Sequence, residues 1–446
     1  MTYVPHSESD WAAMLAAVGV GTVEELFRGI PAPLRETAAP QLPGPLTESE
    51  LLHHLQELAR RNTSLYDLVC FAGGGIYDHF IPSIVLDVIN RPEFKTGYTP
   101  YQAEASQGIL QALFEYQSMI CELTAMPVAN ASLYDGASAI GEAVLLAAAH
   151  TQRSRALVSR AVSPQGRAVA RTYCEATGVR VCEVPYEDET GRTDLGALRA
   201  ALDDDVCCVV LQHPSYFGVL EQMDAAAQAA HQAGALLVAS VEPISLGLLK
   251  APGHYGADLV VGEGQALGLP PSYGGPLLGV FACRQGMMRR MPGRVVGETT
   301  DADGRRAYCL TLQAREQHIR REKATSNICT SEALCALAAA VYLAALGPTG
   351  VRAVAEQGVR KAHYLCRRLE DEGVARARFS GAFGNEFVVE VEEPADGAVR
   401  RLAKQGYLAG PALCRGYPEL PSCLLLAVTE QRSREDLDGL VAAFGS

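Results

Sequence analysis

Lysine is scarce in this chain of 446 residues: of its 38 basic residues only five are lysines, and the others are arginines. A mechanism that needs a lysine amine therefore has five candidates, which are Lys95, Lys250, Lys323, Lys361 and Lys404. Acidic residues number 51, which leaves a formal net charge of −13. Nucleic acid and an anionic membrane surface are therefore poor candidates for the main partner, because both attract basic proteins.

Three further signals are missing from the sequence. The thirteen cysteines are scattered, without the CxxC or Cys/His spacing of a metal site, so we expect no metal and a reduced, cytoplasmic compartment. The N-terminus has no basic segment followed by an apolar one, so we expect no secretory signal. The longest apolar run, residues 333–346, is shorter than the roughly 20 residues of a membrane span and predicts a buried helix.

The order of apolar and polar runs predicts three parts. Thr47 and Glu50 form a capping box ahead of leucines at helical spacing, so residues 1–70 are expected to be an N-terminal helical segment. Short apolar runs then alternate with alanine-rich helices, which is typical of a mostly parallel sheet covered on both faces. We therefore expect a large α/β domain over residues 71–325 and a smaller C-terminal α+β domain over residues 326–446.

Two glycine-containing stretches raise the possibility of phosphate binding. Residues 132–143 lead into an alanine-rich helix, and small residues there expose N–H groups that favour an anion. An ordinary turn and cap is the competing interpretation of that stretch. Residues 73–75 are three consecutive glycines, but they do not fit the GxGxxG pattern of a dinucleotide loop, so a turn is the better interpretation.

Two polar stretches remain. Tyr98 and Tyr101 flank a Thr-Pro turn that could present hydroxyl groups to a cleft, although packing is the commoner role of such tyrosines. Residues 315–327 form the densest charge run, which a solvated helix face with an ion pair such as Glu316 with Arg320 would explain. Because that run ends in Thr-Ser-Asn just before a buried helix, it also indicates a hinge or an interface.

Taken in order, four stretches resemble the glycine cleavage system P-protein family, glycine dehydrogenase (decarboxylating). They are GGGIYDHFIP at 73–82, YTPYQAEASQG at 98–108, NASLYDG at 130–136, and residues 315–329, which contain the charge run. The resemblance implies the aminotransferase-like fold type I of pyridoxal-phosphate (PLP) enzymes. Members of the family consist of one chain with two related halves or of two subunits, and this chain resembles the N-terminal half, subunit 1.

The resemblance makes the position of each lysine important. A PLP enzyme holds its cofactor as a Schiff base to a lysine, which in this fold follows a late strand of the large domain. The corresponding residues 258–268 contain no lysine, and Gln265 stands near the expected position. Glu242 stands where an aspartate is usual opposite the pyridinium nitrogen. The resemblance therefore implies that PLP is carried by the partner, P-protein subunit 2, and that none is covalently bound here.

By the same resemblance, the complete enzyme decarboxylates glycine and transfers the aminomethyl group to the lipoyl arm of H-protein. Active sites of this fold lie at subunit interfaces, so a chain without the lysine still contributes loops to its partner. The candidates are then a substrate and interface cleft and a vestigial cofactor region. The first comprises Tyr98, Thr99, Tyr101, Asn130 and Ser132, and the second comprises Asp135, Gly136, Ser138 and Gln265.

Two alternatives stay open on the sequence. One is a self-contained PLP-dependent lyase or aminotransferase that uses Lys250. The other is a structural or regulatory binding protein without a catalytic partner, for which Tyr98 and Tyr101 would have no role in glycine decarboxylation.

Overall fold

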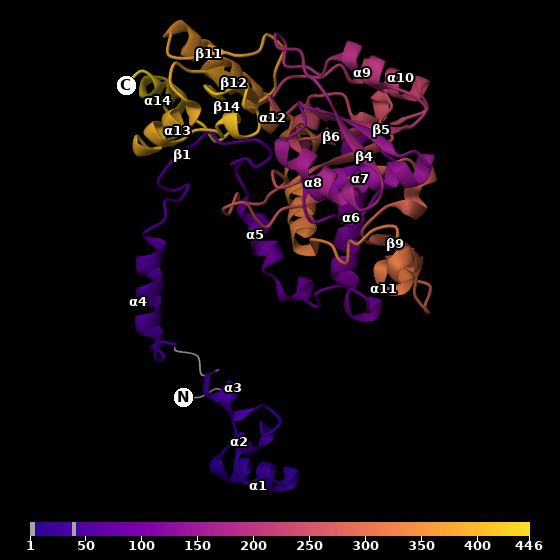
Figure 1. Ribbon diagram of the computed structural model, residues 1–446, viewed down its shortest axis with the longest axis vertical. Coiled ribbons are helices and arrows are strands. Elements are labelled where there is room, and N and C mark those ends of the chain that lie inside the picture. The colour runs from indigo at the N-terminus through magenta and orange to yellow at the C-terminus, as the bar shows by residue number, and fades with distance from the viewer. Residues whose placement is uncertain (1–4, 38–41) are drawn as a thin grey trace. The chain divides into compact units, whose positions relative to one another are not determined.

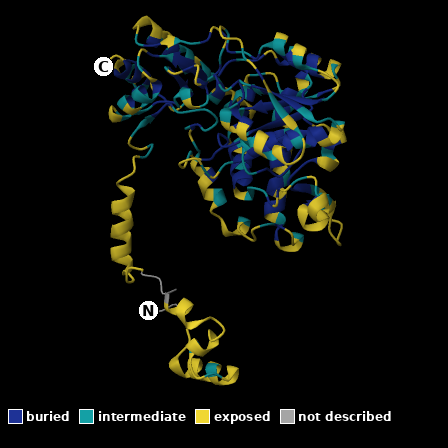
Figure 2. Ribbon diagram, viewed as in Figure 1, coloured by how far each residue is buried: buried dark blue, intermediate teal, exposed yellow. Residues whose placement is uncertain are grey.

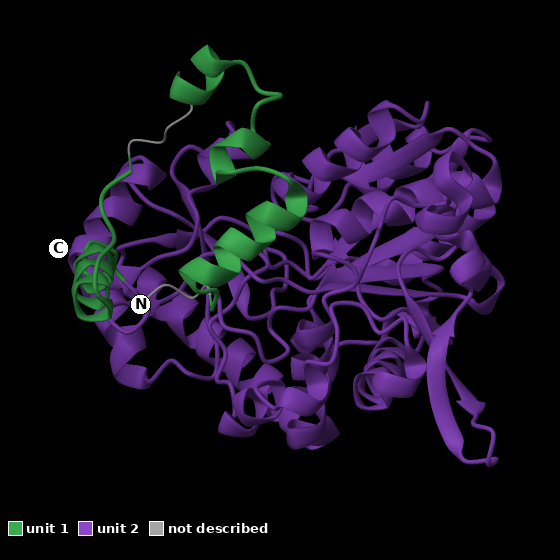
Figure 3. Cartoon of the chain, turned by 90° about the horizontal axis from the view of Figure 1, so that it is seen from below, with its two compact units in different colours: residues 1–63 green, residues 64–446 purple. Residues whose placement is uncertain are grey.

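The chain folds into two compact units in a computed structural model that describes residues 5–37 and 42–446 (Figure 3). The units are residues 1–63 and residues 64–446. Residues 1–4, where the stretch searched for a secretory signal begins, lie outside the described residues. The described helices of the first unit are α1 Glu8–Val18, α2 Val23–Leu26, α3 Ala32–Thr37 and α4 Glu48–Ala59. The capping box expected at Thr47 is confirmed, since its hydroxyl accepts from the N–H of Glu50.

A seven-stranded sheet forms the centre of the second unit (Figure 1). Its strand order is β2-β8-β7-β6-β5-β3-β4, in which β4, β3, β5, β6 and β7 run parallel while β8 and β2 pair antiparallel. The expected mostly parallel sheet is therefore confirmed. The strands are β2 Val128–Ala129, β3 Arg155–Ser159, β4 Arg180–Val184, β5 Val206–His213, β6 Leu236–Val241, β7 Leu259–Glu263 and β8 Gly279–Cys283.

Helices cover both faces of this sheet, and the strand side chains alternate between them. Val209 and Leu211 pack into a core shared with α6, α10 and α12, whereas Cys208 and Val210 pack into a core shared with α7 and α8. Figure 2 shows the resulting buried interior. The helices are α5 Ser83–Ile89, α6 Gln107–Thr124, α7 Gly136–Thr151, α8 Pro164–Glu175, α9 Leu195–Ala201, α10 Met223–Gln232 and α12 Ala333–Asp371.

The C-terminal part has its own small sheet and core. Strand β12 lies between β11 and β14, and the helices α13, α14 and the end of α12 pack against them. A second pair, β1 with β13, is parallel, and β9 with β10 is an antiparallel hairpin. The elements are β1 Val69–Cys70, β9 Val295–Thr300, β10 Arg306–Thr311, α11 Gln317–Arg320, β11 Arg376–Ala377, β12 Glu386–Glu390, α13 Ala395–Lys404, β13 Tyr407–Leu408, β14 Cys423–Ala427 and α14 Arg434–Phe444.

Helix α12 joins the two cores. Its backbone bends at Gly347, which has φ 61°, just before Pro348. By length and composition it is the one described helix apolar enough to cross a membrane. However, Leu337 and Tyr342 are buried in the core of the large sheet and Leu365 in the C-terminal core. It is therefore a core helix, as the sequence predicted for its first half.

Candidate functional site

The loop that carries Tyr98, Thr99 and Tyr101 lies at the surface of the second unit. Tyr98 is 85% exposed and Tyr101 is half exposed, so both rings are accessible. The hydroxyl of Thr99 lies 3.1 Å from that of Thr330, which belongs to the segment that follows the charge run. The loop is thus tethered at Thr99 while Tyr98 projects from it.

The side chain of Arg294 also holds this loop in place. Its guanidinium is buried, donates to the hydroxyl of Tyr101 and lies over the ring of that tyrosine. It also donates to the buried carboxylate of Glu316 and to the carbonyl of Cys329. One arginine therefore joins the YTPYQ loop, residues 98–102, to the start of the charge run and to the segment just after it.

Asn130 and Ser132 lie beside this anchor, but inside the protein. The amide of Asn130 donates to the carbonyl of Pro292 at 3.0 Å, and the hydroxyl of Ser132 accepts from the N–H of Glu332 at 3.0 Å. Both side chains are buried. The backbone N–H of Ala131 bonds to the carbonyl of Arg294 at 2.8 Å. The structure thus brings the five predicted cleft residues to one region, with Asn130 and Ser132 in supporting positions.

Sequence reasoning missed Arg294, and it assigned Glu316 incorrectly. The expected solvated helix face does not form at Glu316, because its carboxylate is buried and paired with Arg294. Only Gln317–Arg320 of this run is α-helical. Arg320 instead donates to the carbonyl of Ala314. The charge run was a usable signal, but the partner of Glu316 lies 22 residues away and cannot be found from helical spacing.

A second region lies at the carboxyl ends of the parallel strands, where ligands bind in open α/β sheets. A cleft there is lined by Asp135 and Gly136 at the start of α7, by Glu242 after β6 and by Glu263 at the end of β7. Ser138, two residues beyond Gly136 in α7, donates its N–H to the carboxylate of Asp135 at 2.7 Å. This cleft is where the sequence predicted the vestigial cofactor region.

Gln265 lies fully buried beside this cleft, with its side-chain amide committed to the backbone. Its carbonyl oxygen accepts from the N–H of Tyr77 at 2.8 Å. Its nitrogen donates to the carbonyl of Tyr77 at 3.1 Å and to that of Leu269 at 2.6 Å. Gln265, at the expected lysine position, therefore links the GGGIYD stretch to the segment after β7. We call these three hydrogen bonds the clasp of Gln265.

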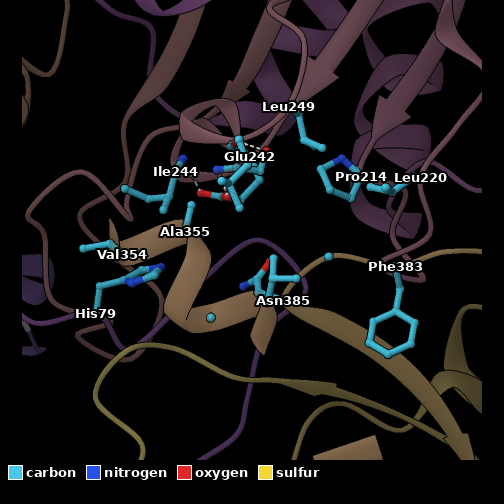
Figure 4. A pocket seen from close by; sticks show the side chains of 15 residues that line it. His79, Pro214, Leu220, Glu242, Ile244, Leu249, Val354, Ala355, Phe383 and Asn385 are labelled. Atoms are coloured by element: carbon cyan, nitrogen blue, oxygen red, sulfur yellow. Dashed lines mark hydrogen bonds between the residues drawn. The ribbon is translucent and has the colours of Figure 1, made fainter. Parts of the chain in front are cut away.

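Glu242 is also committed to local structure. Its carboxylate turns back onto the 3-10 helix that follows β6 and accepts from the N–H groups of Ile244 at 2.8 Å and Ser245 at 2.6 Å (Figure 4). Burial raises the pKa of the Glu242 carboxyl. The mainly apolar hollow beside it is also lined by His79, whose Nδ1 lies 2.7 Å from the carboxylate of Glu430.

Lys250 lies outside the cleft at the carboxyl ends of the parallel strands. Its side chain is half exposed, and its ammonium lies 2.5 Å from the carboxylate of Asp224. Among the described residues that line the cleft there is no lysine and no arginine. The residues present therefore do not fit PLP, which needs a lysine amine for its Schiff base and donors or cations for its phosphate.

The fold defines the class of protein. A sphingosine-1-phosphate lyase of Burkholderia pseudomallei superposes with a TM-score of 0.67 at 15% identity, covering 93% of this chain and 94% of that one. A crystal structure of glycine decarboxylase (P-protein) of the glycine cleavage system, in inhibitor-bound form, superposes with a TM-score of 0.91 at 45% identity, covering 100% of this chain and 99% of that one. The chain has the fold type I architecture of PLP-dependent transferases.

The sequence comparisons narrow this class to one family. The family model described as glycine cleavage system P-protein matches residues 1–444. A probable glycine dehydrogenase (decarboxylating) subunit 1 from Moorella thermoacetica is 54% identical over 443 residues, which is 99% of each chain. The chain therefore belongs to the glycine cleavage system P-protein family, and its full-length matches place it with the subunit 1 members.

Proposed function

We propose that this chain is the subunit of a two-chain glycine decarboxylase that carries no PLP of its own and completes the active site of subunit 2. The observation that carries this proposal is the buried, fully hydrogen-bonded Gln265 at the position expected for the Schiff-base lysine. PLP on the partner supplies the electron sink for decarboxylation of glycine. The product is an aminomethyl group passed to the lipoyl arm of H-protein.

The YTPYQ loop is the part of this chain that we assign to the partner's site. Tyr98 is exposed and projects from a loop that Thr99 and Arg294 hold in place. We infer that Tyr98 reaches toward glycine or PLP, whereas the hydroxyl of Tyr101 is already committed to Arg294 and positions the loop. Asn130 and Ser132, being buried, support the segments beneath.

The N-terminal unit supports the existence of a partner chain. Taken by itself, this unit buries none of residues 5–36 and 42–63. Two of its helices nevertheless begin with complete capping boxes. The leucines of α4, at positions 51, 52, 55 and 58, are 38–53% exposed. Exposed apolar side chains at helical spacing mark interaction surfaces, so we assign α4 to contact with subunit 2.

The compartment follows from the cysteines. All thirteen are free thiols, including buried ones on β5 and β14. Free thiols in this number fit a reducing cytoplasm, where disulfides are rare. We therefore place the complex in the cytoplasm.

The decisive experiment is reconstitution. The samples compared are this chain alone, this chain with a subunit 2 chain, and the Tyr98→Phe and Tyr101→Phe variants of this chain, each with the same subunit 2 chain. Glycine-dependent CO2 exchange is expected only from the pair, and loss of a hydroxyl contact to substrate in Tyr98→Phe is expected to cost about tenfold in rate. Tyr66→Phe, at a fully exposed tyrosine, is the matched control.

Two results would contradict the proposal. The first is borohydride reduction with PLP that labels one lysine of the isolated chain stoichiometrically, which would favour the self-contained enzyme that uses Lys250. The second is a pair whose exchange rate is unchanged in both Tyr98→Phe and Tyr101→Phe, which would favour a binding protein whose loop takes no part in the chemistry.

A further inference from the structure

The N-terminus of α7 already holds an anion, and that anion belongs to the chain itself. The N–H of Gly136, in the first turn of the helix, donates at 2.9 Å to Oε2 of Glu263. The N–H of Ser138 is taken by the carboxylate of Asp135. The unpaired donors and the dipole of a helix start favour a negative group, which in many enzymes is a phosphate of the ligand. Here the negative group is a side chain at the end of β7.

Glu263 is held firmly in that place. Its other oxygen, Oε1, accepts from the N–H of Gln265 at 3.0 Å and from the N–H of Leu278 at 2.9 Å. Three backbone donors from three segments thus fix one carboxylate, which is the arrangement of an anion site with its anion in place. Burial raises the pKa of this carboxyl and the same N–H groups lower it, which together leave the pKa at about 7. The side chain is therefore the anion of this site above about pH 7.

Close backbone packing makes the contact specific. A Cβ placed on Gly136 would lie 2.8 Å from the backbone nitrogen of Glu263, closer than a side chain tolerates. The glycine that in a phosphate site would let a ligand approach therefore lets β7 approach instead. The helix start and the strand end are packed against each other, with the carboxylate between them.

The acidic side chains that line the cleft also disfavour the binding of a phosphate. Asp135, Glu242 and Glu263 all line it, and no lysine or arginine does so among the described lining residues. A phosphate ester brought to this cleft would meet like charges without a compensating cation. It would also have to displace three hydrogen bonds of Glu263 before reaching the helix.

We propose that Glu263 is a built-in substitute for the cofactor phosphate, which closes the remnant cleft of this subunit to PLP and to other phosphate esters. The chain thereby keeps the fold of a PLP enzyme while excluding the cofactor by occupation of its anion site, in addition to lacking the lysine. One consequence rests on the proposed function, namely that each pair of chains binds a single PLP, on subunit 2.

The test is a titration of the full-length chain with inorganic phosphate and with PLP, followed by equilibrium dialysis. The unaltered chain is expected to show no saturable site that phosphate and PLP share. Glu263→Ser removes the carboxylate and frees the helix start, so this variant is expected to bind one phosphate per chain at least about tenfold more tightly. Glu221→Ser is the matched control, because Glu221 is also a carboxylate held by a backbone N–H, but that N–H belongs to Thr193, away from the start of α7.

Two outcomes overturn the proposal. One is a phosphate-displaceable PLP site, one per chain, in the unaltered protein. The other is a folded Glu263→Ser chain that binds phosphate no more tightly than Glu221→Ser. If Glu263→Ser does not fold, the titration of the unaltered chain decides alone. Both readouts are independent of glycine exchange, so an inactive pair with a closed cleft refutes the proposed function and leaves this inference standing.

Discussion

The guanidinium of Arg294 lies over the ring of Tyr101, with its central carbon 4.7 Å from the ring centre, and donates to the hydroxyl of that tyrosine. The same side chain pairs with the buried carboxylate of Glu316. This relationship ties an exposed aromatic loop to a buried ion pair. A perturbation of the ion pair is therefore expected to reach the loop.

Removal of Arg294 is expected to destabilise the chain strongly. In Arg294→Ala the carboxylate of Glu316 stays buried without its arginine, although Nδ1 of His318 still lies 3.5 Å away. Breaking a buried pair of this kind costs about 3–5 kcal/mol of unfolding free energy. Urea denaturation measures the change. Arg305→Ala is the control, because Arg305 is exposed and its pairing with Asp303 is worth about 0–1 kcal/mol. A loss at Arg294 no larger than at Arg305 would contradict the assigned role.

The clasp formed by Gln265 predicts a second stability effect. Gln265→Ala leaves the N–H and carbonyl of Tyr77 and the carbonyl of Leu269 without this partner in a buried place. Each unsatisfied buried group costs about 1–3 kcal/mol, so we expect a total loss of about 3 kcal/mol or more. Thermal denaturation measures it, with the exposed Gln285→Ala as control. Equal melting temperatures for the two variants would refute the clasp.

Glu386 predicts a dependence of stability on pH. Its carboxylate is buried, accepts from the N–H of Gly74 and the hydroxyl of Tyr77, and burial raises its pKa from 4.5 to about 7. The folded chain therefore binds this proton more tightly than the unfolded chain. The resulting stabilisation is complete below about pH 4.5 and is lost as the pH rises to about 7, which amounts to about 3 kcal/mol.

Glu386→Gln tests this dependence. The variant keeps the size of the side chain and has no proton to lose. Between pH 5 and pH 8 its unfolding free energy is therefore expected to decrease less than that of the unaltered chain, by a difference of up to about 3 kcal/mol. Glu390→Gln, on the same strand and paired with Arg376 nearer the surface, is the matched control. Parallel profiles for unaltered chain and Glu386→Gln would show that another group is responsible.

Helix α4 predicts an effect on assembly without an effect on folding. Leu52→Ser with Leu55→Ser removes two exposed apolar side chains, so the melting temperature of the isolated chain is expected to stay constant. If these leucines contact subunit 2, their loss raises the dissociation constant of the pair by about tenfold or more. Sedimentation of the mixed chains measures this constant. Gln56→Ser, on the same helix, is the control, and equal constants for both variants would remove α4 from the interface.

The sequence predicted those elements whose pattern is strong by itself. The runs 206–211 and 258–261 are mostly apolar and predict strands, and β5 and β7 begin and end within two residues of these bounds. Helix α6 was not predicted, although Ile109, Leu113 and Tyr116 recur at helical spacing and are buried. The β9–β10 hairpin was also missed, because the later residues of β9, such as Glu298, are polar and exposed.

Contacts between distant residues were the part that no local pattern could predict. Gly136 and Glu263 are 127 positions apart, and their hydrogen bond depends on where the fold places the start of α7 and the end of β7. The absence of a lysine at Gln265 was visible in the sequence. That the carboxylate of Glu263 accepts from the first turn of α7 became visible only in three dimensions.

Helix α12 contributes Leu337 to the core of the large sheet and Leu365 to the C-terminal core, on either side of the bend at Gly347. Neither core can lose its structure without removing a wall from the other. Residues 64–446 are therefore expected to unfold as a single cooperative transition, with one calorimetric peak whose van't Hoff and calorimetric enthalpies agree.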